Sequence, residues 1–128
     1  MAIQIKSVER PQPGVKGGGT KKFYASPVHD REISLDALTK AIEKTSTVSG
    51  ADIRAVLYAM VEEAIIGLSD GRIIRLGDLG SLRISISSEG KDKMEEVTPA
   101  IVKKAGVIFT PGAKLREMLE HAKFTKAH

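Results

Sequence analysis

The segment from Gly71 to Ile86, GRIIRLGDLGSLRISI, constrains the fold of this chain most strongly. Apolar and polar residues alternate in both of its halves, which is typical of strands with one buried face. Gly77 and Gly80 lie between the halves and permit the positive φ angles that a tight reversal needs. The segment therefore predicts a β-hairpin with one apolar face and one wet, basic face. The apolar face holds Ile74, Leu76, Leu82, Ile84 and Ile86, and the opposite face holds Arg75, Arg83 and Ser85.

Two helices are predicted before this hairpin. Ser34 is a suitable N-cap for a helix that runs to about Lys44. Ser49, with Asp52 three residues later, begins a second helix that continues to Ser69. One apolar stripe follows the second helix, and it consists of Ile53, Val56, Leu57, Met60, Val61, Ala64, Ile65 and Leu68.

Further elements are predicted after the hairpin and near the N-terminus. Residues 107–109 form a short strand, after which Thr110 is expected as the N-cap and Pro111 as the first residue of a last helix. Near the N-terminus, residues 2–8 and 21–25 predict two strands, joined by a mobile loop rich in glycine and proline.

The order of these elements resembles that of the bacterial histone-like HU/IHF DNA-binding proteins. The resemblance rests on the long helix followed by GRIIRLGDLGSLRISI, a variable excursion and VIFTPGAKL, and it covers about Leu35 to Leu119. The N-terminal strands and the form GDLGS are similar to divergent HU-like proteins common in the Bacteroidetes.

This resemblance implies an α+β fold of the IHF-like (HU-like) type. Two helices from the N-terminal half would pack on an antiparallel sheet with a C-terminal helix, with extra N-terminal strands. The family's intertwined homodimer is implied as well. We expect N-terminal strands and a basic loop over residues 1–33, an HU-like domain over 34–120 and a tail over 121–128.

The composition also favours a dimer. The 128 residues include three Phe, two Tyr and no Trp, so a monomer has few large side chains with which to build a core. Sharing a core with a second copy would relieve this shortage.

The absence of cysteine excludes disulfides, thiolate metal sites and cysteine nucleophiles.

Positive charge is concentrated at the two ends of the chain. Residues 1–22 hold five basic residues and one acidic residue, and residues 103–128 hold six basic and two acidic residues. Residues 23–102 hold nine basic and thirteen acidic residues. Clustered Lys and Arg bind phosphates by releasing counterions, so local basic patches predict contact with nucleic acid even on a partly acidic body.

The candidate DNA-binding residues follow from these patches and from the resemblance. The start of the last helix also offers backbone N–H groups to a phosphate. The candidates are Arg75, Arg83, Lys91, Lys93, Lys103, Lys104, Lys114, Arg116, Lys16, Lys21 and Lys22.

The segment from Ser87 to Ala105 takes the place of the long DNA-clasping arms of HU and IHF. It lacks the Arg-Asn-Pro tip whose proline wedges between base pairs in those proteins. Pro99 instead predicts the first turn of a short helix, and Glu95 and Glu96 would repel phosphates. Intercalation and strong bending are therefore not expected.

Catalytic, cofactor and membrane functions find no support in the residue pattern. His29, His121 and His128 are too scattered for a metal site, and no nucleophile, base and orienting group have suitable spacing. The glycines before Thr20 and Lys21 are followed by the reverse of the order in a nucleotide-binding loop. No apolar run resembles a membrane span or a signal peptide, so we expect a cytoplasmic protein at the nucleoid.

The sequence thus predicts a dimeric HU-like protein that contacts the backbone of duplex DNA with little base specificity, in a nucleoid or architectural role. The alternative is a protein-interaction scaffold on an HU-like dimer that has lost the DNA-clasping arm. The acidic middle of the chain and the missing arm tip favour this alternative, whereas the basic ends favour DNA.

Overall fold

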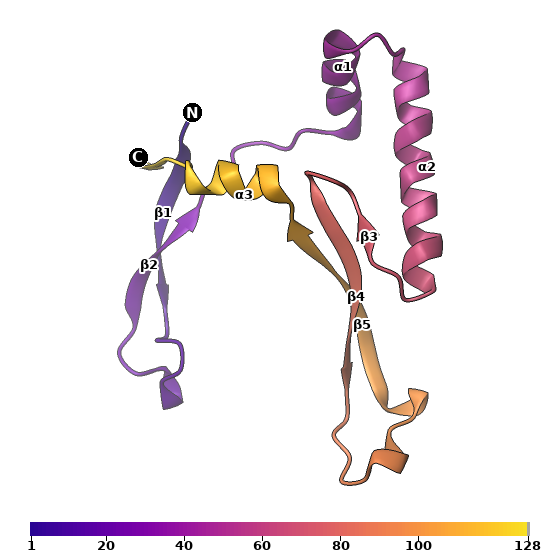
Figure 1. Cartoon of the computed structure of the whole chain (residues 1–128). Helices are drawn as coiled ribbons and strands as arrows, with labels where there is room; N and C mark the ends of the chain where they lie inside the picture. Colours follow the sequence, from indigo (N-terminus) through magenta and orange to yellow (C-terminus); the bar gives the residue numbers. More distant parts are fainter. Residues whose placement is uncertain (128) are drawn as a thin grey trace.

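The structure, a computed structural model, describes residues 1–127, which form a mixed α+β arrangement. These residues fold into three α-helices and two small three-stranded sheets (Figure 1). In chain order the elements are β1 (Ile3–Arg10), β2 (Lys22–Pro27), α1 (Leu35–Thr45), α2 (Gly50–Ser69), β3 (Ile74–Arg75), β4 (Gly80–Ser88), β5 (Val102–Pro111), α3 (Ala113–Glu120) and β6 (Phe124–Lys126). Short 3-10 turns lie at Lys16–Gly18, Met94–Glu96 and Pro99–Ile101.

Both predicted caps of the first two helices are confirmed. The Ser34 hydroxyl accepts a hydrogen bond from the backbone N–H of Ala37 at 3.1 Å. The Ser49 hydroxyl accepts one from the N–H of Asp52 at 3.3 Å. Each serine satisfies an N–H that the helix itself leaves without a partner, so the side chains of these two residues fix where α1 and α2 begin.

The two helices lie side by side, and α2 also contacts the sheet that follows it. Between α1 and α2, Thr39 is buried and its hydroxyl donates to the Leu35 carbonyl at 2.8 Å. At the other end of α2, an added Cβ at Gly67 would meet the tip of the Ile74 side chain of β3. Glycine at this position therefore leaves room for the Ile74 side chain against the helix.

Strands β3, β4 and β5 form an antiparallel sheet, which confirms the predicted hairpin. The β4–β5 ladder runs from the Gly80–Pro111 pair to the Ser88–Val102 pair, with an irregularity between Ser87 and Ser88. Both strands continue into the segment expected as a variable excursion, and the nine residues of β4 make a hairpin about 30 Å long. A long arm is thus present, and the 3-10 turn at Pro99 near its tip was predicted correctly.

The prediction for the start of the last helix is wrong. Thr110 and Pro111 are still paired with Ser81 and Gly80 of β4, so neither residue is helical. Gly112 takes the N-cap position, without a side-chain hydrogen bond, and α3 begins at Ala113. The sheet ladder has overridden the local preference of threonine and proline for a helix start.

The extra N-terminal strands form a second sheet with the order β2-β1-β6. Strand β2 is antiparallel to β1, and β6 is parallel to it. Strand β6 comes from the segment predicted as a tail, whose last residue, His128, lies outside the described residues. Helix α3 connects the two sheets, and the β1–β2 and β4–β5 hairpins extend to the same side of it (Figure 1).

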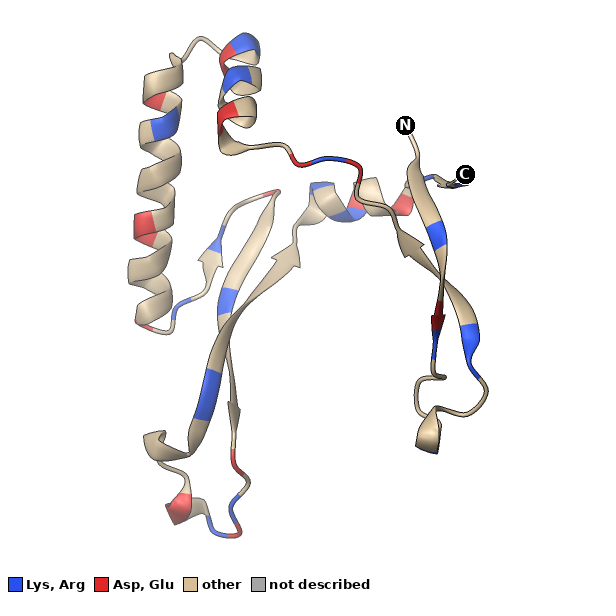
Figure 2. Ribbon diagram, turned by 180° about the vertical axis from the view of Figure 1, so that it is seen from behind, with Lys and Arg blue, Asp and Glu red and all other residues tan. Residues whose placement is uncertain are grey.

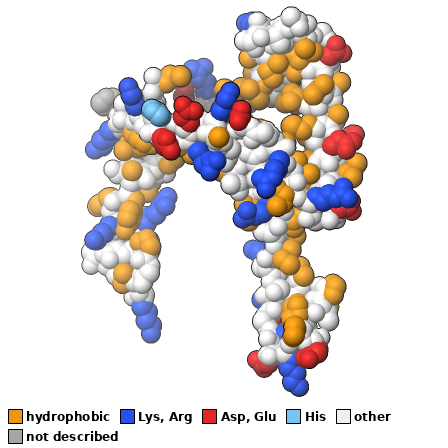
Figure 3. Space-filling view, in the orientation of Figure 1, with side chains coloured by type: hydrophobic (Ala, Val, Ile, Leu, Met, Phe, Trp, Pro, Cys, Tyr) orange, Lys and Arg blue, Asp and Glu red, His pale blue; other side chains and the backbone are white. Residues whose placement is uncertain are grey.

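Residues 1–127 enclose almost no hydrophobic core. Among them, Ile53 and Ile101 are the only buried large apolar side chains. The chain exposes 10998 Å², whereas a compact protein of its 13.8 kDa exposes about 6,600 Å². The excess of about 4,400 Å² follows from the open shape in Figure 3, in which apolar side chains lie uncovered over the helices and hairpins.

The apolar stripe of α2 shows that one chain covers only part of each apolar surface. Ile53 is buried, and Leu57 is half-buried. Val56, Val61 and Ile65 belong to the same stripe but are 66%, 52% and 58% exposed. The stripe is wider than the chain's own sheet and first helix can cover.

We predict that Gly80→Ala destabilises the fold by about 2 to 4 kcal/mol. Gly80 has a φ of +150°, and an added Cβ would overlap the Thr110 carbonyl and the Phe109 ring. Urea denaturation at a fixed protein concentration measures the change. Gly90→Ala is the matched control, because nothing lies within 4 Å of a Cβ there. Equal stability of the two variants would contradict the packing described at the base of the hairpin.

Candidate nucleic-acid interface

The sheet β3-β4-β5 has two chemically opposite faces. Directly paired residues share a face in an antiparallel sheet, so the register divides the side chains unambiguously. One face is apolar from the base of the hairpin as far as the Ile86–Ala105 pair, and we call this stretch the hairpin apolar face. It consists of Ile74, Leu82, Ile84, Ile86, Ala105, Val107 and Phe109.

The opposite face, the hairpin basic face, carries Arg75, Arg83 and Lys104. Arg75 pairs with Ser81, Arg83 with Ile108 and Lys104 with Ser87, which places all three cations on one side. The residues between them are mostly small or polar: Ser81, Ser85, Ser87, Gly106 and Thr110. Strands β3, β4 and β5 contain no Asp or Glu, as the ribbon in Figure 2 shows. Nothing within these strands neutralises the face.

The ladder irregularity lies at the outer end of this face and leaves one further lysine outside the ladder. Ser87 pairs with Lys104 and Ser88 pairs with Val102, so Lys103 is the extra, unpaired residue of a β-bulge. A bulge bends the strand and increases its twist, which alters the direction of the hairpin from this point to the tip.

The tip of the hairpin has the opposite charge balance from its strands. Residues 89–101 contain Lys91 and Lys93 but four acidic residues, Glu89, Asp92, Glu95 and Glu96. Lys91 already forms an ion pair with Glu89, with its Nζ 3.4 Å from the carboxylate. The structure therefore separates these two predicted lysines from the hairpin basic face.

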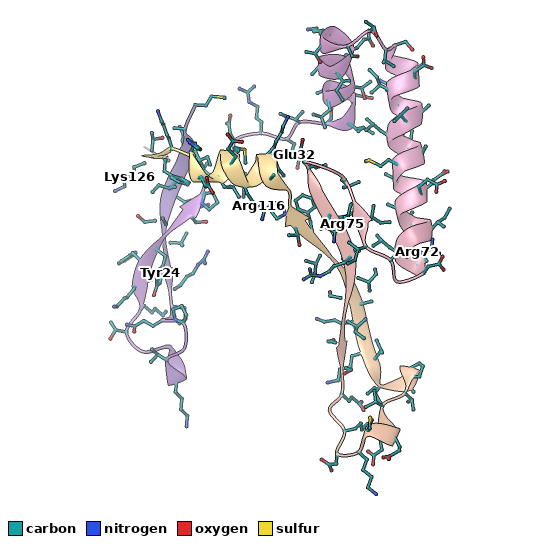
Figure 4. All side chains as sticks on the ribbon, in the orientation of Figure 1. Tyr24, Glu32, Arg72, Arg75, Arg116 and Lys126 are labelled. Atoms are coloured by element: carbon teal, nitrogen blue, oxygen red, sulfur yellow. The ribbon has the colours of Figure 1, made fainter. Side chains whose placement is uncertain are left out.

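A pocket at the base of the hairpin brings two predicted arginines together from different elements. Arg75 of β3 and Arg116 of α3 line this pocket, along with Gly112 and Ala113 at the start of the helix (Figure 4). The N-terminus of an α-helix carries partial positive charge and unpaired N–H donors. An anionic group such as a phosphate would fit the chemistry of this corner. Lys114 lies beside it, with its Nζ 3.9 Å from the Asp78 carboxylate.

The remaining predicted residues, Lys16, Lys21 and Lys22, lie on the β1–β2 hairpin. Lys16 begins the 3-10 turn in the connecting loop, Lys21 directly precedes β2, and Lys22 is the first residue of β2. In Figure 4, Tyr24 marks this hairpin and Arg75 marks the β3-β4-β5 sheet, at opposite ends of α3. The predicted site residues thus fall into two separate groups.

Two basic residues that the sequence did not single out belong with the second group. Lys6 pairs with Ser26 and Arg10 pairs with Lys22, so all three cations share one face of β1 and β2. The alternation within residues 2–8 was visible in the sequence. The register of β1 against β2 was not visible in the sequence, because it depends on how many residues the connecting loop contains.

Other kinds of site are not found in the described part of the chain. Residues 1–127 contain no group of three or more His, Asp or Glu side chains that could hold a metal ion. No helix among these residues is both long and apolar enough to span a bilayer.

Comparison with known proteins agrees with this architecture. A search of curated proteins finds no match. A crystal structure described as a putative bacterial DNA-binding protein from Bacteroides vulgatus ATCC 8482 superposes with a TM-score of 0.68 and 17% sequence identity. The match covers 98% of this chain and 47% of that one, so the chain spans about half the length of that protein.

A family model decides the classification, because it matches almost the whole chain. The match extends over residues 1–126 and therefore includes the N-terminal strands and β6 as well as the helices and the long hairpin. The resemblance seen in the sequence is confirmed: the chain belongs to the HU-HIG family, described as an HU domain fused to a wHTH, Ig or glycine-rich motif.

Proposed function

We propose that this protein binds duplex DNA as a dimer, through the sugar-phosphate backbone and with little sequence specificity, in a nucleoid or architectural role. The hairpin basic face carries the proposal, because Arg75, Arg83 and Lys104 lie together on a surface without acidic residues. Membership of a family described by an HU domain, and the fold shared with a protein described as a putative bacterial DNA-binding protein, support the same function. A protein in this role would work in the cytoplasm, at the nucleoid.

Contact with phosphates suits this face better than readout of bases. Reading bases requires a helix or ribbon that presents several hydrogen-bonding side chains to base edges in a groove. The hairpin basic face instead separates its cations with serine, threonine and glycine, apart from Ile108 opposite Arg83. Such a surface places charges against a backbone, and contacts of this kind carry no direct sequence information.

The exposed apolar surface supports a dimer. The total surface of the chain exceeds that of a compact protein of its mass by about 4,400 Å². This excess is several times the 800 Å² or so that one partner buries in an ordinary interface. An extensive, intertwined interface between two copies would bury the outer part of the α2 stripe and the hairpin apolar face. Each chain would then complete the other's core.

We predict that Ile65→Asp disrupts the dimer and unfolds the protein. On a monomer this 58% exposed residue would tolerate the change within about 0.5 kcal/mol, whereas in a dimer core the substitution buries an unpaired charge. Light scattering after size-exclusion chromatography should give a dimeric mass for the wild type. Its melting temperature should rise with protein concentration. Glu62→Gln on the same helix is the control, and a stable monomeric wild type would contradict the proposal.

The DNA interface is tested by neutralising the three cations of the hairpin basic face. We predict that Arg75→Gln, Arg83→Gln and Lys104→Gln together weaken binding of a fluorescent duplex and flatten its salt dependence. The slope of log K against log salt should fall by about 0.9 for each lost phosphate contact, or about 2.7 for each subunit. Anisotropy over a salt series measures both quantities.

The matched control removes three cations from elsewhere in the same chain. Arg31 lies in the segment before α1, and Lys40 and Lys44 lie on α1, so their change to Gln lowers the net charge equally. Binding by this control should stay close to that of the wild type. An equal loss in both triple variants would show that only net charge matters, and it would remove the interface from the hairpin basic face.

A scaffold for another protein is the second candidate function. The observation in its favour is the hairpin tip, which is net acidic and exposes 85% of Met94 and 63% of Val97. The same salt series separates the two functions. If the wild-type dimer fails to bind duplex DNA even at low salt, the scaffold becomes the better account.

A further inference from the structure

The β1–β2–β6 sheet repeats the two-faced pattern of the long hairpin. Ile5 pairs with both Pro27 and Lys126, and Ile3 pairs with Phe124, so these residues share one side of the sheet. The cross-strand pairs of Ser7 with Ala25 and of Glu9 with Phe23 lie on that side too. This side is largely apolar, and its two charged residues are Glu9 and Lys126.

The other side of this sheet is basic, and we call it the N-terminal basic face. Its cations are Lys6, Arg10 and Lys22, and none of the residues that share the face is acidic. Between the cations lies the half-buried pair of Val8 and Tyr24. The polar neighbours are Gln4, Ser26 and Thr125.

The charges on this face lack compensation within the fold. Arg10 lies directly opposite Lys22, and like charges in such a cross-strand pair destabilise a sheet. The ion pairs formed by residues 1–127 involve neither of these residues nor Lys6. An external anion would relieve this repulsion, whereas a protein partner with an apolar surface would bury it.

We propose that the N-terminal basic face is a second contact surface for the backbone of the same duplex DNA. This inference rests on the proposed function and extends it to Lys6, Arg10 and Tyr24. Lys6 and Arg10 are four residues apart on β1, which separates them by about 13 Å along the strand. That distance matches the rise of about four base pairs, so both cations can contact phosphates of one short duplex segment.

The arrangement of the two hairpins allows one duplex to reach both basic faces. Helix α3 joins the sheets and, with eight residues, is about 12 Å long. Both hairpins extend to the same side of it, and Figures 1 and 2 show this from opposite directions. A duplex lying on that side of α3 would have a hairpin at each end of the helix to contact.

The first arm of the test compares single substitutions on the two sides of the sheet. Lys6→Gln should weaken duplex binding and lower the salt slope by about 0.9 for each subunit, because it removes one phosphate contact. Lys126→Gln removes the same charge from the opposite side and should leave the slope unchanged. Combining Lys6→Gln with Arg10→Gln and Lys22→Gln should lower the slope by about 2.7 for each subunit.

The second arm detects direct contact instead of a change in charge. A photo-crosslinking benzoylphenylalanine is placed at position 24, on the N-terminal basic face, or at position 23, on the opposite side. Irradiation with labelled duplex should give a crosslinked product from position 24 and little from position 23. This comparison remains informative if the triple variant fails to fold.

The outcomes separate this inference from the proposed function. If the wild type binds duplex but position 24 does not crosslink and Lys6→Gln behaves like Lys126→Gln, the second surface is overturned and the hairpin basic face stands. If the wild type does not bind duplex at all, the proposed function fails. Crosslinking at position 24 together with a loss specific to Lys6→Gln establishes the second surface.

Discussion

The uncovered apolar surface of a single chain is the constraint on which the rest of this structure depends. Strand alternation gives each sheet one apolar and one basic face, and the α2 helix carries a stripe wider than its own chain can cover. Apolar faces of this extent are stable in water only when something covers them. In our account, a second copy covers them, and the basic faces remain in solvent. The same alternation that requires a partner thus leaves the cations exposed to a ligand.

Local charge matters more than net charge in this account. The chain as a whole carries only +4, and its helical part is acidic. The cations of β3, β4 and β5 nevertheless meet no carboxylate within their own strands, while the hairpin tip is net acidic. A duplex would therefore be held along the strands of the hairpin instead of by its tip. This differs from the clasping mode that the resemblance to HU and IHF would suggest.

Much of the fold could be predicted from the sequence because it depends on local rules. The caps at Ser34 and Ser49, the alternation across the hairpin and the 3-10 turn at Pro99 all follow from residues that are close in sequence. The helix start at Thr110 was predicted incorrectly because ladder pairs with β4, distant in sequence, outweighed a local preference. The parallel pairing of β6 with β1 joins the two ends of the chain, and no local pattern reveals it.

The candidate site likewise combines residues that local sequence places correctly with residues that only long-range pairing brings together. Arg75 and Arg83 could be placed on one face because they lie in a single hairpin with a short turn. Lys6 and Arg10 were missed because their relation to Lys22 depends on the register across a long loop. The meeting of Arg75 and Arg116 at one pocket depends on the path of the chain from β5 into α3. Such relations arise only from the folded arrangement of the elements.

Native mass spectrometry of the protein mixed with a short duplex reports the number of subunits and the bound DNA in one measurement, so it tests dimerisation and DNA binding together. We expect a dominant species of two chains and one duplex, which loses its DNA as the salt concentration of the sample is raised. A folded single chain on the duplex would contradict the shared core, and a dimer that never carries DNA would contradict the role of the basic faces.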